Sequence, residues 1–192
     1  MRKLSVAVLQ LPLARPEPAD NIAAVSALVE EAAGKGAQVI LPPELFAGEY
    51  FCRMEEEELF DLAHPTLESP SVQAMQELAA KLGVAIPTSF FERDGQHYYN
   101  TLAMIGHAVS NCMPVCAANR IGHEGPADRQ QSFYGHSFIS DEWGDLVAEF
   151  GGSSEGVLTA TLDLDRARKH RAGMGFFRDR RPQLYGRISE DI

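Results

Sequence analysis

The first 41 residues carry the pattern that most restricts the fold, because two apolar segments flank one with helical periodicity. Residues 5–10 predict a buried strand. Apolar side chains then recur at helical spacing from a cap at Asp20 or Asn21 to an end at Gly36. Residues 38–41 predict a second short strand. The order strand, helix, strand indicates a parallel pair joined by a right-handed crossover, and therefore an α/β fold.

Turn and cap residues divide the rest of the first half. Ser69 followed by Pro70 predicts the start of a second helix. Residues 84–92 and 97–105 predict two strands, and the segment 93–96 between them predicts the turn of a hairpin. The first half is therefore expected to hold helices and strands in alternation, as an α/β sandwich requires.

The second half is expected to consist mostly of strands. Residues 114–119 predict a short strand, and residues 137–140 and 146–150 predict a second hairpin. Residues 156–162 predict one more strand, after which Asp163 caps a basic helix.

The junction between the two halves is abrupt. Only a short segment separates Ile105 from Pro114, and its residues 106–111 predict no more than the last turn of a helix. A sandwich of this class alternates helices and strands throughout, so the halves meet where further elements are expected.

Charge and apolar content limit the partners. The formal net charge of −10 argues against a nucleic-acid partner, since phosphate contacts need clustered Lys and Arg. No segment approaches the length of about 20 apolar residues that spans a bilayer. Residues 1–6 lack the apolar core and cleavage site of a signal peptide. With three cysteines, too few for a disulfide framework, we expect a cytoplasmic protein without a membrane partner.

Glu44 is the main candidate for chemistry. It follows the expected end of a parallel strand, where open α/β sheets place their sites, and Pro42 and Pro43 restrict the loop before it. Its position predicts a functional carboxylate, such as a general base, about as strongly as it predicts a solvated loop carboxylate.

A general base needs a nucleophile, and no cysteine has the expected setting. Cys52 follows an aromatic pair in a loop, Cys116 lies inside an apolar strand, and Cys112 lies at the entrance of that strand. Core or loop packing is expected of each. The lysines are expected to be surface charges remote from Glu44; they are Lys3, Lys35, Lys81 and Lys169.

A metal site is the other possibility. Cys112 and Cys116 have a spacing that zinc sites use, and His107 and His123 flank them. The histidines do not form a paired motif, and Cys116 belongs to a strand, so we expect neither a metal nor another cofactor. A serine hydrolase is also disfavoured, because no G-x-S-x-G elbow occurs.

Several dispersed segments together carry a family resemblance. They are VAVLQ (6–10), PELF (43–46) with YFC (50–52), AHP (63–65), SFFE (89–92), YYNTL (98–102), PV (114–115) with ANRIG (118–122), FYG (133–135), and FRDRRP (177–182) with LYG (184–186). In this order they resemble the nitrilase, or carbon–nitrogen hydrolase, superfamily, and most closely its N-carbamoylputrescine amidases. The resemblance covers nearly the whole chain.

The resemblance implies a four-layer αββα sandwich with a Glu-Lys-Cys triad, formed by one domain over residues 1–192. It implies that Glu44 is the general base and that Tyr50 lines the substrate pocket. The family Lys and Cys belong to a block expected between Ile105 and Gly106, which this chain lacks. The expected fold is therefore an incomplete sandwich without central strands and a helix, made of an N-terminal part (1–105) and a C-terminal part (106–192).

The implied function is hydrolysis of a small-molecule substrate, a linear N-carbamoyl amine or amide of polyamine metabolism. Because the family Lys and Cys are absent, this activity is expected to be lost or strongly impaired. Two alternatives stay open. In the first, the chain is a non-catalytic protein that pairs with a full-length relative through the tail 176–182. In either role we expect a homo-oligomer, or a hetero-oligomer with a full-length relative. In the second, the chain is a fragment from a deletion, a skipped exon or a faulty gene model.

Overall fold

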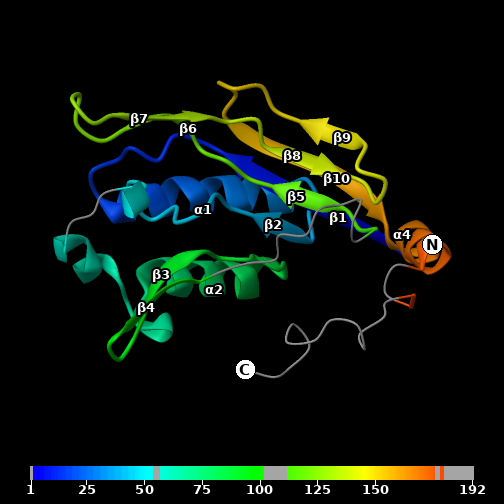
Figure 1. Cartoon of the computed structure of the whole chain (residues 1–192), viewed down its shortest axis with the longest axis horizontal. Helices are drawn as coiled ribbons and strands as arrows, with labels where there is room; N and C mark the ends of the chain where they lie inside the picture. The colour runs from blue at the N-terminus through cyan, green and yellow to red at the C-terminus, as the bar shows by residue number, and fades with distance from the viewer. Residues whose placement is uncertain (1, 54–56, 102–111, 176–177, 180–192) are drawn as a thin grey trace.

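The structure of the chain is a computed structural model that describes residues 2–53, 57–101, 112–175 and 178–179. Its helices and strands follow one another along the chain as Figure 1 shows. In order they are β1 (Lys3–Gln10), α1 (Pro18–Gly34), β2 (Val39–Leu41), α2 (Pro70–Leu82), β3 (Phe90–Asp94), β4 (His97–Thr101), β5 (Val115–Ala117), β6 (Ile121–Glu124), β7 (Gln131–Tyr134), β8 (Phe138–Ser140), β9 (Leu146–Glu149), β10 (Gly156–Asp163) and α4 (Leu164–Met174). Three short 3₁₀ helices lie between β2 and α2: η1 (Phe51–Arg53), η2 (Glu57–Leu62) and η3 (Thr66–Glu68).

The first sheet has the strand order β10-β1-β2. β1 and β2 are parallel and are joined through α1, as the strand, helix, strand pattern predicts. β10 returns from the end of the chain to pair antiparallel with all of β1, from Lys3 opposite Asp163 to Gln10 opposite Gly156. Strands from the first and the last part of the sequence therefore lie side by side in one sheet.

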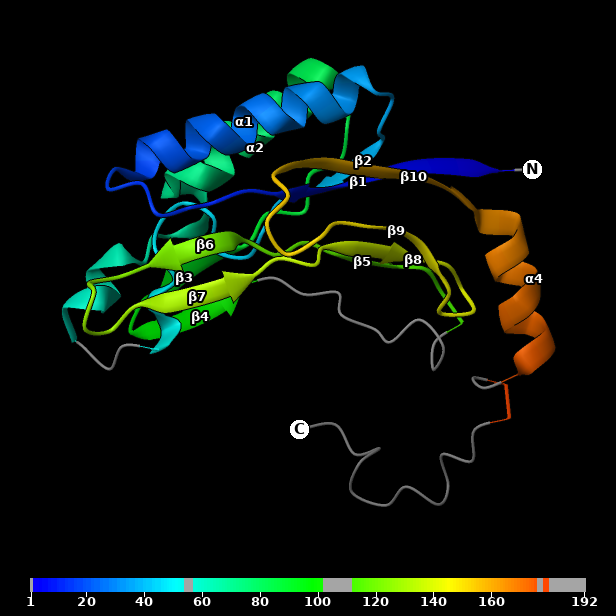
Figure 2. The same cartoon turned by 90° about the horizontal axis from the view of Figure 1, so that it is seen from above.

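Alternation along β1 places its side chains in two different cores, because successive residues of a strand point to opposite faces. Ala7 and Leu9 pack with α1 and α2 on one side. Val6 and Val8 pack on the other side with Ile139 of β8. Figure 2 shows the result as layers: helices, then the first sheet, then the strands of the second half.

The strands of the second half form the second layer. β8 pairs with both β5 and β9, all antiparallel. The β6-β7 hairpin continues from the end of β1, since Ile121 donates its amide to the carbonyl of Leu11 at 3.2 Å. β3 and β4 form an antiparallel hairpin from Phe90 opposite Thr101 to Asp94 opposite His97, which matches the turn predicted over 93–96.

The outer face of the second layer has no helix over it among the residues described. α4 lies at the ends of the strands rather than across them (Figure 2). Leu146 and Val147 of β9 are accordingly 59% and 48% exposed. A mixed α/β architecture with helices, sheet and sheet fits the incomplete αββα sandwich that the sequence predicts. None of the described helices is long and apolar enough to cross a membrane.

Two details of the predicted elements are wrong. α1 begins at Pro18, with Glu17 at the N-cap position and no side-chain cap, because proline is favoured in a first turn. Asn21 is instead fully buried and donates to the carbonyl of Arg15 at 3.2 Å. The strand predicted over 84–92 is regular only from Phe90, since Pro87 interrupts it and has no amide to donate.

The β6-β7 hairpin was not predicted, because it carries a Gly and a His in place of a continuous apolar run. The cap at Asp163 is confirmed: its carboxylate accepts from the amides of Asp165 and Arg166, each at 3.1 Å. The predicted helical turn over 106–111 lies outside the described residues, as does most of the tail 176–182.

Candidate active site

The loop that carries Glu44 leaves the carboxyl end of β2, the end at which parallel sheets place their sites. Leu45 and Phe46, which follow, are 5% and 0% exposed and anchor the loop in the core. Leu45 takes a left-handed conformation with a φ of 49°. The backbone therefore turns sharply there, and the Glu44 side chain stays exposed while its neighbours are buried.

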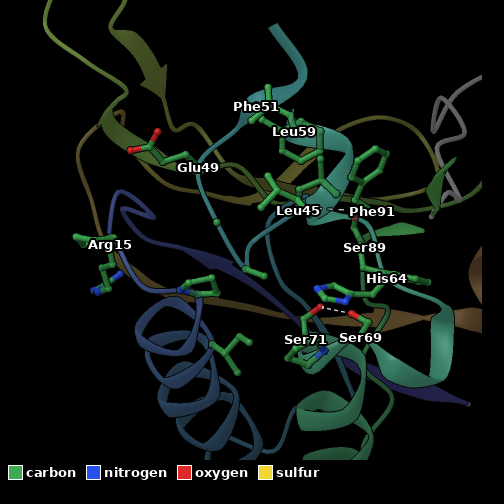
Figure 3. A pocket seen from close by; sticks show the side chains of 18 residues that line it. Arg15, Leu45, Glu49, Phe51, Leu59, His64, Ser69, Ser71, Ser89 and Phe91 are labelled. Atoms are coloured by element: carbon green, nitrogen blue, oxygen red, sulfur yellow. Dashed lines mark hydrogen bonds between the residues drawn. The ribbon is translucent and has the colours of Figure 1, made fainter. Parts of the chain in front are cut away.

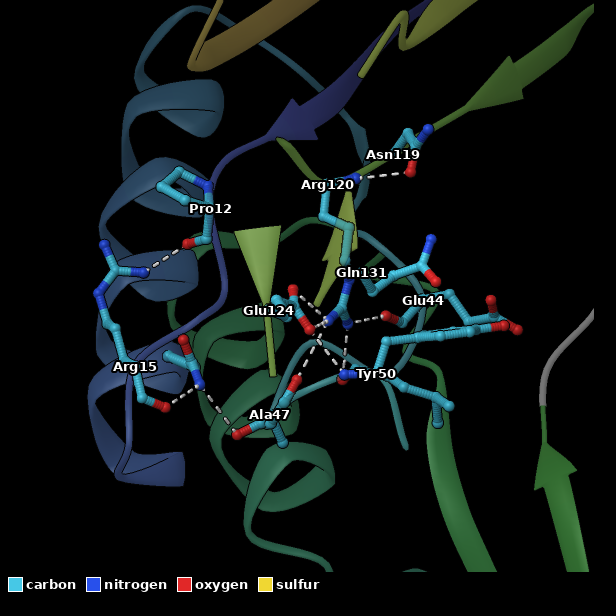
Figure 4. Close-up of polar contacts among 12 residues, drawn as sticks. Pro12, Arg15, Glu44, Ala47, Tyr50, Asn119, Arg120, Glu124 and Gln131 are labelled. Carbon is cyan, nitrogen blue, oxygen red and sulfur yellow. Dashed lines mark hydrogen bonds and ion pairs between the residues drawn. The ribbon is translucent and has the colours of Figure 1, made fainter. Parts of the chain in front are cut away.

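Arg120 holds this loop from beneath. Its Nη2 donates to the carbonyl oxygens of Glu44 at 2.7 Å and of Leu45 at 3.1 Å. Its Nη1 donates to the carbonyl oxygen of Gly48 at 3.2 Å. Figure 4 shows the guanidinium in the middle of these contacts. Three carbonyls of one loop thus converge on a single cation, whose rigid fork of donors suits such a cluster.

Glu124 balances this charge inside the protein. Its carboxylate accepts from Arg120 Nη1 at 2.7 and 2.8 Å, and both side chains are only 3% exposed. It also accepts from the backbone amide of Tyr50 at 2.7 Å. The ion pair therefore fixes both ends of the loop, Glu44 and Tyr50, and buried charges of this kind need such additional hydrogen bonds.

Aromatic rings enclose the cation. The guanidinium carbon of Arg120 lies 5.4 Å from the centre of the Tyr50 ring and 5.2 Å from that of Phe133. The two rings meet edge to face with centres 5.8 Å apart. Such placement over ring faces adds cation–π attraction and excludes water from the ion pair.

The Tyr50 side chain interacts with both Glu44 and Cys52, since the carboxylate and the thiol each affect the ionisation of its hydroxyl. Burial, together with the charge of Glu44, raises the pKa of Tyr50 to about 12. The phenol is therefore neutral at physiological pH and has a proton to donate to a neighbouring acceptor.

A cavity of about 300 Å³ opens beside Glu44. Tyr50 and Arg120 contribute to its wall, and so do Asn119 and Gln131. Asn119 donates to the carbonyl of Gly135 at 2.8 Å and accepts from the Arg120 amide at 2.9 Å, so its side chain is held in place. The arrangement offers one carboxylate and a phenol to a small polar molecule.

No lysine or cysteine lines this cavity within the described ranges. Cys52 was expected to be packed in the core or the loop, but its side chain is exposed and interacts with Tyr50. Partial burial nevertheless raises the pKa of its thiol, which keeps it protonated and a poor nucleophile at neutral pH. Cys112 is buried, and burial raises the pKa of Cys116 in β5 to about 11.

The lysines lie at the surface, as predicted. Lys3, Lys35 and Lys81 pair with Asp163, Glu31 and Glu30 at 3.3, 2.7 and 2.8 Å. In the part of the chain that the structure describes, no group of three or more His, Cys, Asp or Glu could hold a metal ion. His107 of the weak zinc pattern lies outside that part.

Arg120 and Glu124 were missed as site residues by sequence reasoning. The signal available was an Arg and a Glu four residues apart around the apolar Ile121, a spacing that usually marks a surface pair. Here Glu124 lies in β6 and Arg120 in the irregular segment just before it, and both side chains are buried beneath the loop.

Comparison with known proteins gives the family. Residues 5–107 and 102–172 match, as two segments, the family model described as carbon-nitrogen hydrolase. N-carbamoylputrescine amidase of Arabidopsis thaliana is 31% identical over 266 residues, covering 86% of this chain and 88% of that protein. The enzyme of the same name from Solanum tuberosum is 30% identical over 283 residues, with 96% and 94% covered. A citrullinase of Francisella tularensis is 29% identical over 283 residues, with 98% and 99% covered.

Solved structures agree on the fold. A carbon-nitrogen hydrolase from Helicobacter pylori G27 superposes with a TM-score of 0.83 at 19% identity and covers 98% of this chain and 99% of that chain. The CN-hydrolase superfamily protein XC1258 from Xanthomonas campestris has a TM-score of 0.74 at 18% identity, with 94% and 98% covered. Both support the layered arrangement described above.

Proposed function

We propose that this chain, which belongs to the carbon–nitrogen hydrolase family, is an N-carbamoylputrescine amidase-like member of it. In this proposal the chain binds its substrate beside Glu44 but hydrolyses it very slowly. The observation that carries the proposal is the exposed Glu44 carboxylate at a cavity whose described wall holds no lysine and no cysteine. The base of the family site is present, and its partners are not beside it.

The two-segment match supports a missing central block. The segments meet at residues 102–107, around the junction of Ile105 and Gly106. The alignment with the Solanum tuberosum relative extends over 283 positions, more than the 192 residues of this chain, so that relative has residues without a counterpart here. By resemblance, the family Lys and Cys belong to that block. The parts 1–105 and 106–192 would then be one domain interrupted at this junction.

The remaining groups suit recognition of a carbamoyl or amide group. Such a group offers N–H donors, and the Glu44 carboxylate accepts them. Tyr50, neutral because burial raises its pKa to about 12, lines the cavity with Glu44 and contributes an aromatic wall for a linear apolar stem. Attack on the carbon, however, needs a nucleophile, and its loss in a triad typically costs on the order of a million-fold in rate.

The test is ammonia release from N-carbamoylputrescine by the purified chain, with binding of the same compound followed by calorimetry. We expect binding that Glu44→Gln weakens and ammonia release no faster than in buffer. Efficient release that Glu44→Gln abolishes would show that catalysis is not impaired. Ammonia release that survives Glu44→Gln but is abolished by Cys52→Ser would show that Cys52, and not Glu44, is required for hydrolysis.

A second candidate function is that of a non-catalytic partner of a full-length relative. The exposed Leu146 and Val147 on the uncovered sheet face favour it, because such apolar side chains gain from a covering layer. Size-exclusion chromatography of this chain mixed with a full-length relative tests it. The absence of any mixed species would exclude this candidate.

A further inference from the structure

A second cavity lies on the other side of the Glu44 loop. It has a volume of about 310 Å³, within the range of small-molecule sites. Leu45, Ala47, Gly48 and Glu49 line it, whereas Glu44 and Tyr50 line the first cavity. The loop thus separates the two cavities, whose described linings share no residue.

The walls of this cavity are mostly apolar. Its lining comes from the loop, from η1 and η2, from the start of α1 and from β3. The side chains of Leu45, Phe51, Leu59 and Phe91 lie close together in Figure 3 and form one side of it. These side chains suit the hydrocarbon part of a ligand, since apolar surface removed from water favours binding.

One end of the cavity is polar and buried. Ser69 and Ser71, only 3% and 2% exposed, line it at the start of α2, and their hydroxyl oxygens lie 3.1 Å apart. A pair of hydroxyls has two protons, and this contact uses one of them. Among the described residues these hydroxyls make no other hydrogen bond, so the second proton is available to an acceptor in the cavity, where His64 also lies (Figure 3).

The start of α2 strengthens this end. Ser69 occupies the N-cap position, but its side chain makes no cap hydrogen bond and contacts Ser71 instead. The first-turn amides therefore lack the usual side-chain acceptor, and the helix dipole favours negative charge here. Arg15 and Glu49, of opposite charge, lie at the other side of the cavity in Figure 3, so Glu49 does not oppose an anion beside the serines.

We infer that this second cavity binds a small monocarboxylate with an apolar body, its carboxylate at Ser69 and Ser71 and its hydrocarbon against the Leu45 side of the wall. The carboxylate accepts the spare hydroxyl proton and faces the uncapped helix start. The apolar body fills space that the loop and η2 leave open. The ligand class differs from the carbamoyl amines proposed for the Glu44 cavity, and the inference does not depend on that proposal.

The test uses octanoate as probe and octan-1-ol as the matched neutral probe, each titrated into the whole chain by calorimetry. We expect octanoate to bind at least tenfold more tightly than octan-1-ol, the scale of a hydrogen bond to a charged group. Replacing both serines (Ser69→Ala with Ser71→Ala) should weaken octanoate about tenfold and leave octan-1-ol unchanged.

A cavity-filling variant locates the site. A Cβ at Gly48 would meet no heavy atom within 4 Å, so Gly48→Leu places a side chain in open space at the cavity wall. The same is true of Gly34 at the end of α1, away from the cavity, which makes Gly34→Leu the control. Octanoate binding should be lost in Gly48→Leu and kept in Gly34→Leu, with the same circular-dichroism melt in both.

Three outcomes would overturn the inference. Octanoate that does not bind the unmodified chain excludes the site. Equal affinity for octanoate and octan-1-ol excludes a carboxylate end. Octanoate that binds Gly48→Leu as well as Gly34→Leu places the binding elsewhere. If Gly48→Leu fails to fold, the double serine variant still tests the inference. It compares the affinities for octanoate and octan-1-ol, and that difference depends on the polar end of the cavity.

Discussion

Arg120 Nη2 lies 2.7 Å from the carbonyl oxygen of Glu44, across 76 residues of sequence. The candidate base is therefore positioned through its own backbone by a cation from the far half of the chain. The same guanidinium is 3% exposed and paired with Glu124. This contact joins the N-terminal and C-terminal parts at the one place where the family's catalytic carboxylate is expected.

The first prediction concerns this buried pair. Arg120→Ala leaves Glu124 as a buried charge without its cation, so the free energy of unfolding should fall by about 3–5 kcal/mol. Urea denaturation followed by circular dichroism measures it. Lys81→Ala is the control, because Lys81 pairs with Glu30 at the surface, where such pairs contribute about 0–1 kcal/mol.

A double variant separates charge from packing. Arg120→Met with Glu124→Leu removes both buried charges at once, so its loss of stability should be smaller than the sum of the two single losses, by about 0.5–3 kcal/mol. Strict additivity would show that the two side chains do not act as a pair.

The second prediction is the ionisation of Tyr50. Its pKa is raised to about 12 by burial and by Glu44, so one tyrosine should titrate well above the ordinary value in an absorbance titration near 295 nm. The pKa of Tyr50 is higher in the folded than in the unfolded protein. The neutral phenol therefore contributes fully to the free energy of unfolding below pH 10, and this contribution is lost as the pH rises towards 12. Glu44→Gln should lower that pKa, since it removes the negative charge. A titration curve unchanged by Glu44→Gln would contradict the contact.

The third prediction is the reactivity of Cys52. Partial burial raises the pKa of its thiol, the Tyr50 hydroxyl lowers it, and the charge of Glu44 raises it. Alkylation by iodoacetamide requires the thiolate, so it should become faster in Glu44→Gln and slower in Tyr50→Phe. Peptide mass spectrometry after timed alkylation at pH 8 measures both. The two variants must move the rate in opposite directions, which a general loosening of the loop would not do.

Much of the fold follows from local pattern. The first strand and helix, the start of α2 at Ser69-Pro70 and the cap at Asp163 were all predictable, because each rests on periodicity or on a terminal residue. The pairing of β10 with β1 was not, since it joins segments at opposite ends of the sequence and no local pattern encodes a partner.

The candidate site likewise contains residues that the sequence pattern identifies and residues that it does not. Glu44 was found from its position after a strand, and its role as a base stays a prediction. Arg120 and Glu124 were not found, because their spacing is that of an ordinary surface pair and only tertiary packing buries it. The second cavity was not found either, since it is formed by segments that are separate in sequence.

The last prediction tests how the two halves pack at Gly135, in the turn after β7. This residue has a φ of 65°, and a Cβ there would lie 2.8 Å from Ile121 Cγ2 and 3.1 Å from the carbonyl oxygen of Gly152. Gly135→Ala should therefore lower the free energy of unfolding by about 2–4 kcal/mol, from a left-handed conformation combined with overpacking. The nearby Gln10 Nε2, 3.0 Å from that Cβ, belongs to a side chain that accepts from the amide and hydroxyl of Ser137 at 3.0 and 2.7 Å. The methyl group would thus press on the contact between β1 and the turn that leads to β8.

Gly34→Ala is the control for this prediction. Its Cβ meets nothing within 4 Å, so it should raise the free energy of unfolding by about 0.4–1 kcal/mol by reducing the conformational freedom of the unfolded chain. Urea midpoints that shift in opposite directions for these two replacements would support the packing of residues 112–175 against β1, and equal shifts would contradict it.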